Sequence, residues 1–347
     1  MCWTHPSIRA HDEEVTSTPQ THSATGSAHP GPGGTRSARP GADTGQGRRR
    51  AGITLLTALA PATWGTTYIV TTHLLPEGHP LFAALMRALP AGLLALLLTR
   101  TLPWGHWWWK ALVLGTLNIG AFFPLLFLAA QHLPGGVAAT LGAAQPILVA
   151  LLVVPVLGER LSRWRLTWGI VGVAGVAMVV LGPEAGLDPL GIAAGLLGTA
   201  SMGLGVVLTK RWGRPPGISS LTLAGWQLGA GGLVLLVPTL LIDGIPAGID
   251  GPAVLGYLWL GLVGGLLAYT LWFGGIRRLP VTATALLGLL SPLVAAGVGV
   301  LLAGETFTAV QLLGFALALA AMLAGQVAPR PRIALQRTSQ PEGNPIP

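Results

Sequence analysis

The chain has 347 residues, of which 51% are hydrophobic and only 9% are charged, against about 25% charged in ordinary soluble domains. Its mean hydropathy of +0.65 therefore excludes a typical globular protein. The net charge of +8 would suit a nucleic-acid ligand, but the basic residues lie in loops and tails, so we expect no nucleic-acid partner.

Residues 1–50 are rich in Ser, Thr, Pro, Gly, His and Arg and contain no apolar run. Such a segment cannot bury enough surface to offset the entropy of ordering, so we expect a disordered N-terminal tail. It also lacks the apolar stretch of a signal peptide. A start codon assigned too early is the alternative explanation for this segment.

Ten apolar runs follow, separated by short polar breaks. A run of about 20 apolar residues is long enough to cross the hydrocarbon of a bilayer as a helix. We therefore predict an all-α integral membrane protein with ten transmembrane helices, followed by a cytoplasmic C-terminal tail at 328–347. The expected spans are 52–73, 80–99, 108–130, 134–156, 164–182, 189–209, 219–241, 253–274, 281–302 and 307–327.

One stretch of the chain occurs twice, at a distance of 146 residues. Residues 133–159 read LPGGVAATLGAAQPILVALLVVPVLGE, and residues 279–305 read LPVTATALLGLLSPLVAAGVGVLLAGE, with ten identities in 27 positions. Self-similarity at a long fixed period indicates an internal duplication. Each copy carries a proline, Pro146 or Pro292, which removes a backbone hydrogen bond and is expected to kink its helix.

The duplication divides the predicted helices into two halves of five. Residues 51–182 form the first repeat and residues 188–327 the second, on either side of a polar break at 183–189. Because five is odd, the second half must cross the membrane in the opposite sense. The sequence thus predicts two inverted five-helix repeats.

The distribution of charge supports this inverted arrangement. With the amino terminus inside, the inner segments hold 16 basic residues, whereas the five outer loops hold none and carry six acidic residues. Lys and Arg accumulate in cytoplasmic loops. We therefore predict that both termini are cytoplasmic, in a plasma or inner membrane.

The chain resembles the EamA-type drug/metabolite transporter superfamily over residues 51–327. Its motifs are Gln145-Pro146 through Gly158-Glu159-Arg160-Leu161, Ser291-Pro292 through Gly304-Glu305, and Trp64-Gly65 in the first helix. The family implies two EamA repeats and transport of small metabolites or drugs, commonly by export, along a path lined by the first four helices of each half. In the second half Ser201-Met202-Gly203 stands where Trp-Gly is expected, so we predict no symmetric role there.

Polar and aromatic side chains inside the spans are the candidate substrate contacts, because polar groups in a membrane are costly and often functional. Arg87 is the only charged residue well inside a predicted span. It needs a carbonyl, water or an anionic substrate group, unless it snorkels to the interface or braces the bundle. Each other candidate either touches substrate or contacts a neighbouring helix or the interface: Trp64, Tyr68, Asn118, Gln145, Gln227, Tyr269, Trp272 and Ser291.

Other functional classes lack their motifs in this sequence. There is no G-x-x-x-x-G-K-[ST] loop for ATP, no G-x-S-x-G and no H-E-x-x-H, so neither a pump nor an intramembrane enzyme is expected. Cys2 is the only cysteine, and we expect no cofactor and no metal. No Asp or Glu lies deep in a span, which leaves facilitated diffusion or a coupling route without a buried carboxylate.

We therefore predict a multi-pass exporter of amino acids or related compounds that works by alternating access. Its expected partners are a small-molecule substrate and the lipid bilayer, and the sequence is compatible with a homodimer. An importer or exchanger, such as a nucleotide-sugar carrier, is the alternative, and an intramembrane enzyme is a remote one. Substrate, direction and coupling ion stay open.

Overall fold

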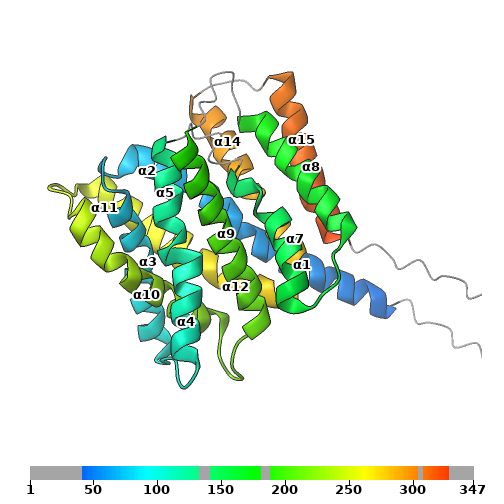
Figure 1. Ribbon diagram of the computed structural model, residues 1–347, viewed down its shortest axis with the longest axis horizontal. Helices are drawn as coiled ribbons and strands as arrows, with labels where there is room; N and C mark the ends of the chain where they lie inside the picture. The colour runs from blue at the N-terminus through cyan, green and yellow to red at the C-terminus, as the bar shows by residue number, and fades with distance from the viewer. Residues whose placement is uncertain (1–40, 133–140, 181–187, 304–307, 328–347) are drawn as a thin grey trace, which may run out of the picture. The chain divides into compact units, whose positions relative to one another are not determined.

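The computed structural model of the chain describes residues 41–132, 141–180, 188–303 and 308–327, and every secondary-structure element in these ranges is a helix. The chain divides into Met1–Thr44 and one large compact unit, Gly45–Pro347, to which the following description applies. The first half contains α1 (Gly41–Gly65), α2 (Thr67–Leu74), α3 (Pro80–Thr99), α4 (Trp107–Gly115), α5 (Phe122–His132), α7 (Gln145–Leu157) and α8 (Arg163–Val180) (Figure 1). The second half contains α9 (Pro189–Trp212), α10 (Ser220–Pro238), α11 (Gly251–Leu258), α12 (Ala268–Arg278), α13 (Val281–Leu287), α14 (Leu290–Ala303) and α15 (Ala309–Gln326).

Eight continuous helical stretches in the described residues are long and apolar enough to cross a membrane. They are Gly47–Thr71, Pro80–Thr99, Trp107–Leu126, Pro189–Trp212, Ser220–Asp243, Gly251–Arg278, Val281–Val298 and Ala309–Gln326, and a shorter apolar helix covers Leu141–Leu157. The predicted all-helical membrane fold is therefore confirmed. The total of ten spans stays a prediction.

Helix α1 begins at Gly41, eleven residues before the start that hydropathy predicts at 52. Residues 47–50 are exposed helical turns, and Arg50 donates from its guanidinium to the carbonyl of Gln326 at 3.2 Å. Hydropathy marks where a helix enters lipid, whereas its backbone hydrogen bonds can begin earlier in water. The rest of the predicted tails, residues 1–40 and 328–347, lies outside the described residues.

The second helices of the two halves, α3 and α10, pack side by side. A methyl group at Gly92 would meet the backbone of Gly229, and one at Gly232 would lie 2.7 Å from the Cα of Leu89. Lipid supplies no hydrophobic drive between helices, so small residues that allow such close backbone contact stabilise the pair. Glycine at these positions therefore holds the two halves together.

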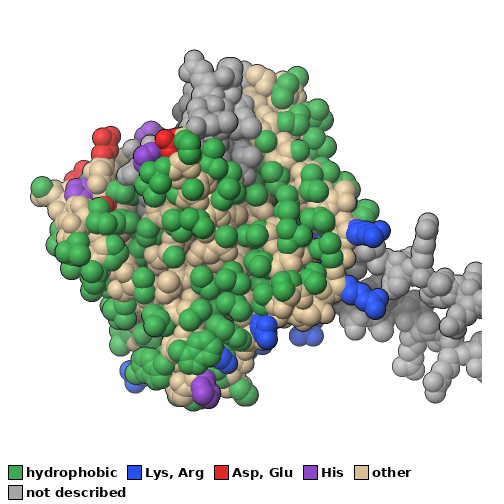
Figure 2. Space-filling view, viewed as in Figure 1, with side chains coloured by type: hydrophobic (Ala, Val, Ile, Leu, Met, Phe, Trp, Pro, Cys, Tyr) green, Lys and Arg blue, Asp and Glu red, His purple; other side chains and the backbone are tan. Residues whose placement is uncertain are grey.

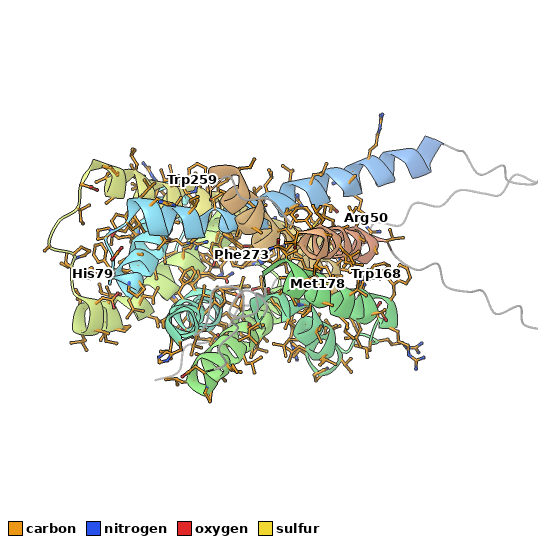
Figure 3. The ribbon with its side chains drawn as sticks, turned by 90° about the horizontal axis from the view of Figure 1, so that it is seen from above. Arg50, His79, Trp168, Met178, Trp259 and Phe273 are labelled. Carbon is orange, nitrogen blue, oxygen red and sulfur yellow. The ribbon has the colours of Figure 1, made fainter. Side chains whose placement is uncertain are left out.

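The fifth helices, α8 and α15, form a second close pair between the halves. A methyl group at Gly175 would lie 2.7 Å from the amide nitrogen of Ala318, and one at Gly314 would lie 2.6 Å from the Cβ of Met178. Figure 3 shows Trp168 and Met178 of α8 beside α15. Second helix thus meets second helix and fifth meets fifth, as a two-fold relation between the halves requires.

The first helices contact the opposite half. A methyl group on Gly65 in α1 would lie 2.6 Å from the carbonyl of Ser291, near the start of α14. In the second half, α9 packs on α5 and α7 of the first half. Each first helix therefore packs against the third and fourth helices of the other half, which extends the same two-fold relation.

Three segments have π-helical hydrogen bonding, in which each N–H bonds five residues back: η1 (Thr116–Gly120), η2 (Thr239–Asp243) and η3 (Trp259–Leu267). Adding the 146-residue repeat distance to the bounds of η1 gives 262–266, inside η3. The third helix of each half is therefore distorted at the same position. Such distortions are rare and frequently mark functional sites.

Helices break directly before both repeated prolines. Ala144 is a turn before α7, and Gly288 and Leu289 are turns before α14. Pro146 and Pro292 consequently lie in the first turn of a new helix, where the missing N–H removes no hydrogen bond. The sequence predicts a kink inside one helix; the structure has an interruption between two shorter ones.

Charged side chains complete the helix ends. Lys210 donates to three carbonyls at the end of α12, at distances of 2.9 to 3.1 Å, and Arg211 donates to the carbonyl of Val156 in α7 at 2.7 Å. At the amino end of a helix the charge is negative: Asp243 accepts a hydrogen bond of 2.5 Å from the amide of Leu81, in the first turn of α3. Cations at carboxyl ends and anions at amino ends both stabilise helix termini. Figure 2 shows the basic side chains at the lower and right-hand edge and the acidic ones at the upper left.

The glycine contact between α3 and α10 generates a paired test of packing. We expect Gly92→Ala to lower stability by about 1–3 kcal/mol, because its methyl group must displace the α10 backbone. Gly297 in α14 has open space around its Cα, so Gly297→Ala should be neutral or slightly stabilising. Thermal unfolding of both purified variants in detergent checks this. Equal melting temperatures would contradict the proposed close contact.

Candidate functional site

Arg87 lies inside the helix bundle, seven residues along α3 from Pro80, and only 7% of it is exposed. Its guanidinium donates to the carbonyl of Gly264 at 3.1 Å and to the hydroxyl of Thr67 at 3.5 Å. The same group lies 5.0 Å from the ring centre of Phe123. A carbonyl, a hydroxyl and the face of a ring thus stabilise the buried cation. Its head does not snorkel to the interface.

Trp64 shares the carbonyl that binds Arg87. The indole N–H of Trp64 donates to the carbonyl of Gly264 at 2.9 Å. Gly264 is the fourteenth residue of the 28-residue span Gly251–Arg278 and lies within η3, so this carbonyl is near the middle of its span. The altered hydrogen bonding of a π segment leaves carbonyls for side chains. Both donors belong to the first half, and the acceptor belongs to the second.

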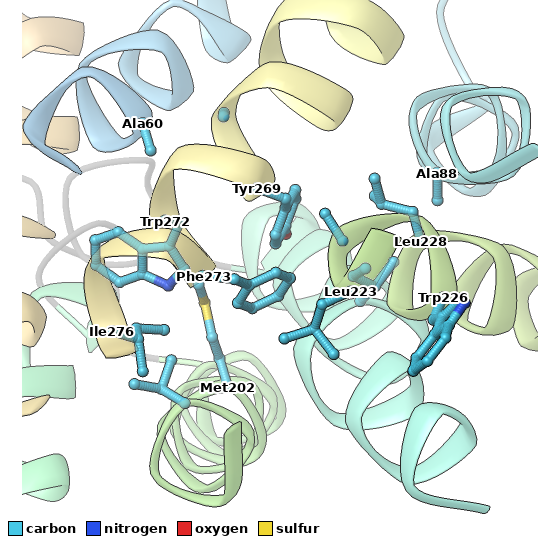
Figure 4. Close-up of a cluster of buried hydrophobic side chains, with 14 of the residues drawn as sticks. Ala60, Ala88, Met202, Leu223, Trp226, Leu228, Tyr269, Trp272, Phe273 and Ile276 are labelled. Carbon is cyan, nitrogen blue, oxygen red and sulfur yellow. The ribbon is translucent and has the colours of Figure 1, made fainter. Parts of the chain in front are cut away.

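Aromatic rings surround this shared carbonyl. The Trp64 ring centre lies 5.1 Å from that of Tyr269 and 5.2 Å from that of Trp272, and Tyr269 lies 5.5 Å from Phe273. Tyr269, Trp272 and Phe273 are at most 1% exposed and project from α12 into the core between α1, α9 and α10 (Figure 4). Such tilted and edge contacts are the favoured geometries of aromatic pairs.

A neutral amide network occupies the related position in the first half. Asn118, in η1, is the residue 146 positions before Gly264. Its Nδ2 donates to the Oε1 of Gln227 at 2.8 Å and to the hydroxyl of Thr209 at 3.5 Å, and all three residues are fully buried. The hydroxyl of Tyr269 donates to the carbonyl of Asn118 at 3.5 Å. This contact joins the network to the aromatic rings.

Two contacts to this network involve residues that sequence reasoning missed. The hydroxyl of Ser201 in α9 donates to the carbonyl of Leu117 in η1 at 2.8 Å. This contact resembles the one from Trp64 to Gly264, one residue out of register because Leu117 aligns with Val263, although no symmetric role was predicted for 201–203. A methyl group at Gly205 would collide with the side chain of Asn118, so a larger residue there would displace the Asn118 amide. The 146-residue offset from Gly264 to Asn118 is the signal that relates the two sites.

Two more of the predicted residues, Gln145 and Ser291, lie at the starts of α7 and α14, directly after the interruptions in the fourth helices. Gln145 is 8% exposed, and its Oε1 lies 3.7 Å from where a methyl group on Gly288 would be. The backbone of Ser291 packs on Gly65, next to Trp64. Tyr68 belongs to α2, but its side chain lies outside the described residues. The described residues contain no cluster of three metal-ligating side chains.

Known proteins resemble the chain over most of its length. The profile of the EamA-like transporter family matches residues 51–181 and 189–324. Protein PecM of Dickeya dadantii is 44% identical over 76% of this chain and 89% of its own length. The uncharacterized inner membrane transporter YedA of Escherichia coli K12 is 28% identical over 72% of this chain and 82% of its own length. A chloroplastic WAT1-related protein of Arabidopsis thaliana is 28% identical over 75% and 66%, respectively.

A solved crystal structure shares the fold. It superimposes with a TM-score of 0.66 at 20% identity and covers 79% of this chain and 96% of its own. At this identity the likeness concerns the fold alone.

The amide pair generates a double-variant prediction. We expect Asn118→Leu and Gln227→Met each to lower stability by about 1–3 kcal/mol, because each leaves the other amide buried without its partner. The double variant should lose less than the sum, since it removes both polar groups. Thermal unfolding of the three variants measures this coupling. Strictly additive losses would show that the two amides do not depend on each other.

Proposed function

Because the chain belongs to the EamA-like transporter family, we propose that it exports small metabolites by alternating access and performs no chemical conversion on them. Its relatives include proteins named as membrane transporters, among them an inner membrane transporter. Transport of a small molecule through a multi-pass membrane protein is therefore the function that its family supports. Export and alternating access are our proposals for this chain.

The reciprocal contacts at the π segments are the observation that carries this proposal. The first half donates from Trp64 and Arg87 to the carbonyl of Gly264, and the second half donates from Ser201 to the carbonyl of Leu117. Alternating access needs two related halves that rock about a site near the midplane. These hydrogen bonds cross between the halves near the middle of their spans. A rocking motion would break and re-form them in alternation.

We propose ten spans with both termini in the cytoplasm. Leu141–Leu157 and α8 would complete the set begun by the eight longer stretches. The two ends of the helix bundle differ in charge, which supports an inner and an outer end. Basic side chains bind at the carboxyl ends of α7 and α12, and an acidic one binds at the start of α3. The inner end, with its Lys and Arg, would face the cytoplasm.

The proposed substrates are amino acids or related metabolites. The guanidinium of Arg87 suits a carboxylate, and the rings beside it suit an apolar or aromatic body. The residues proposed to contact substrate at some stage of the cycle are Arg87, Trp64, Tyr68, Asn118, Gln145, Gln227, Tyr269, Trp272 and Ser291.

Counterflow in proteoliposomes tests the proposal. Purified protein would be reconstituted with an internal pool of an amino acid, nucleoside or cationic drug, and uptake of labelled external compound would be followed. Exchange of any compound, absent from protein-free vesicles, supports transport and identifies its class. Chemical alteration of the recovered compound, or no exchange across a broad panel, would contradict the proposed function. Net flux from loaded cells against an external gradient distinguishes export from import.

Arg87 generates the sharpest prediction for transport. We expect Arg87→Ala to lower counterflow about tenfold or more, since a hydrogen bond to a charged group contributes about 1.5–3 kcal/mol. Arg87→Lys should be intermediate, because it keeps the charge but loses the planar fork. Membrane levels of each variant, measured by quantitative blotting, control for insertion. Equal flux at equal expression would remove Arg87 from the substrate path.

The proposed topology predicts which introduced cysteines are accessible. In a Cys2→Ser background, Glu77→Cys and His106→Cys place a thiol in two exposed loops at opposite ends of the bundle. We expect a membrane-impermeant maleimide to label position 77 in intact cells and position 106 only after permeabilisation. The reverse pattern would place both termini outside.

A further inference from the structure

Trp272 carries a buried indole N–H that has no hydrogen-bond partner in the described part of the chain. The residue is 1% exposed, and its ring packs edge-on against Trp64 at 5.2 Å. An indole offers only a donor, so no rearrangement of its own atoms can satisfy it. A buried donor without an acceptor costs free energy and needs an explanation.

Four other tryptophans among the described residues differ from Trp272 in this respect. Their indole N–H groups donate to backbone or hydroxyl oxygens at 2.8–3.0 Å, as shown by Trp64, Trp164, Trp226 and Trp259. Trp226 is the closest match, since it is 2% exposed and donates to the carbonyl of Thr101 at 2.8 Å. Burial alone does not deprive an indole of an acceptor in this fold. Trp272, which lacks one, lies at the candidate site.

Among the buried amides and indoles of the described residues, more donors than acceptors lack a partner. The Nε2 atoms of Gln145 and Gln227 also have no partner among the described residues, against one such acceptor, the Oδ1 of Asn118. That oxygen lies close to Gly205, where an added methyl group would collide with it. An amide can turn over and exchange its oxygen and nitrogen, whereas an indole cannot. The indole N–H of Trp272 is therefore the donor for which the protein itself offers no alternative, and the two glutamine amides are additional donors without a partner.

The charge at the site is positive and therefore also favours an anionic ligand. The buried cation of Arg87 lies on the carbonyl that also binds Trp64, and Trp64 contacts Trp272. The acidic residues whose side chains the structure describes each lie in a loop or near a helix end: Glu77, Glu159, Asp188, Asp243 and Asp250. A ligand ammonium at the site would meet a like charge and no carboxylate. A ligand carboxylate would meet a cation and unused donors.

We propose that Trp272 is a substrate-binding donor and that the site selects compounds with a carboxylate on an aromatic or apolar body, without requiring an amino group. This inference rests on the transport function proposed above and narrows its substrate class. The indole N–H binds a carboxylate oxygen, and the rings of Trp64 and Tyr269 pack on the body. The unpartnered N–H in the empty protein is the structural cost of a donor reserved for substrate.

A matched pair of variants tests the role of Trp272. Trp272→Phe removes the N–H and keeps an aromatic ring, and Trp226→Phe makes the same change where the N–H is already bonded. We expect Trp272→Phe to raise the apparent KM for a carboxylate substrate about tenfold, the value of one hydrogen bond, while its melting temperature stays unchanged or rises. Trp226→Phe should lower the melting temperature and leave the KM unchanged. An unchanged KM in Trp272→Phe would overturn the proposal.

Three related compounds test the substrate class: phenylacetate, phenylethylamine and phenylalanine. We expect the wild-type protein to exchange phenylacetate in counterflow, phenylalanine equally or less well, and phenylethylamine at least tenfold more slowly. Exchange of phenylethylamine in preference to phenylacetate, or exchange of phenylalanine alone, would overturn the inference and leave transport intact. Exchange confined to other compounds without a carboxylate would also overturn it. No exchange by any compound in the broad panel would instead contradict the proposed function itself.

Discussion

Lipid offers no hydrogen-bond donor to a backbone carbonyl, so each carbonyl within a membrane-spanning helix depends on a donor from the protein itself. The α-helices of this chain meet the requirement through their own backbone, and the π segments in the third helix of each half also accept hydrogen bonds from side chains. The carbonyls of Gly264 and Leu117 accept side chains from the opposite half, namely Trp64 and Arg87 on one side and Ser201 on the other. The association of the halves therefore forms these hydrogen bonds within the apolar region.

Packing between like helices brings those donors within reach. The pair formed by α3 and α10 and the pair formed by α8 and α15 approach closely through glycines such as Gly92 and Gly175. These contacts use the second and fifth helices, so the first helices are left to cross onto the other half. Charged side chains complete the helix ends beyond the apolar region, as Lys210 does for α12. The close glycine contacts thus lie along the paired helices, whereas charged side chains such as Lys210 bind at helix ends.

Sequence reasoning could predict the all-helical membrane fold and several polar residues of the candidate site, because polar groups stand out in an apolar chain. Arg87, Asn118 and Gln227 were found in this way, and the structure brings them into linked contacts. Gly264 could not be found, since it contributes a carbonyl that every residue has, and its role depends on π distortion. Ser201 was missed because its residue type differs from the tryptophan that makes the matching contact. The start of α1 and the interruptions before Pro146 and Pro292 depend on backbone hydrogen bonds, which hydropathy does not report.

The two halves satisfy their related sites with groups of unequal strength. A guanidinium binds the carbonyl of Gly264, whereas the position of Asn118 is held by neutral amides and hydroxyls. Hydrogen bonds that involve a charged donor are roughly twice as strong as neutral ones. For a carrier that breaks one set of contacts as it forms the other, its two end states would differ in energy even with no substrate bound. In the proposed alternating-access cycle this divergence would give the empty protein a preferred resting side, and a substrate that engages Arg87 would relieve that preference as it binds.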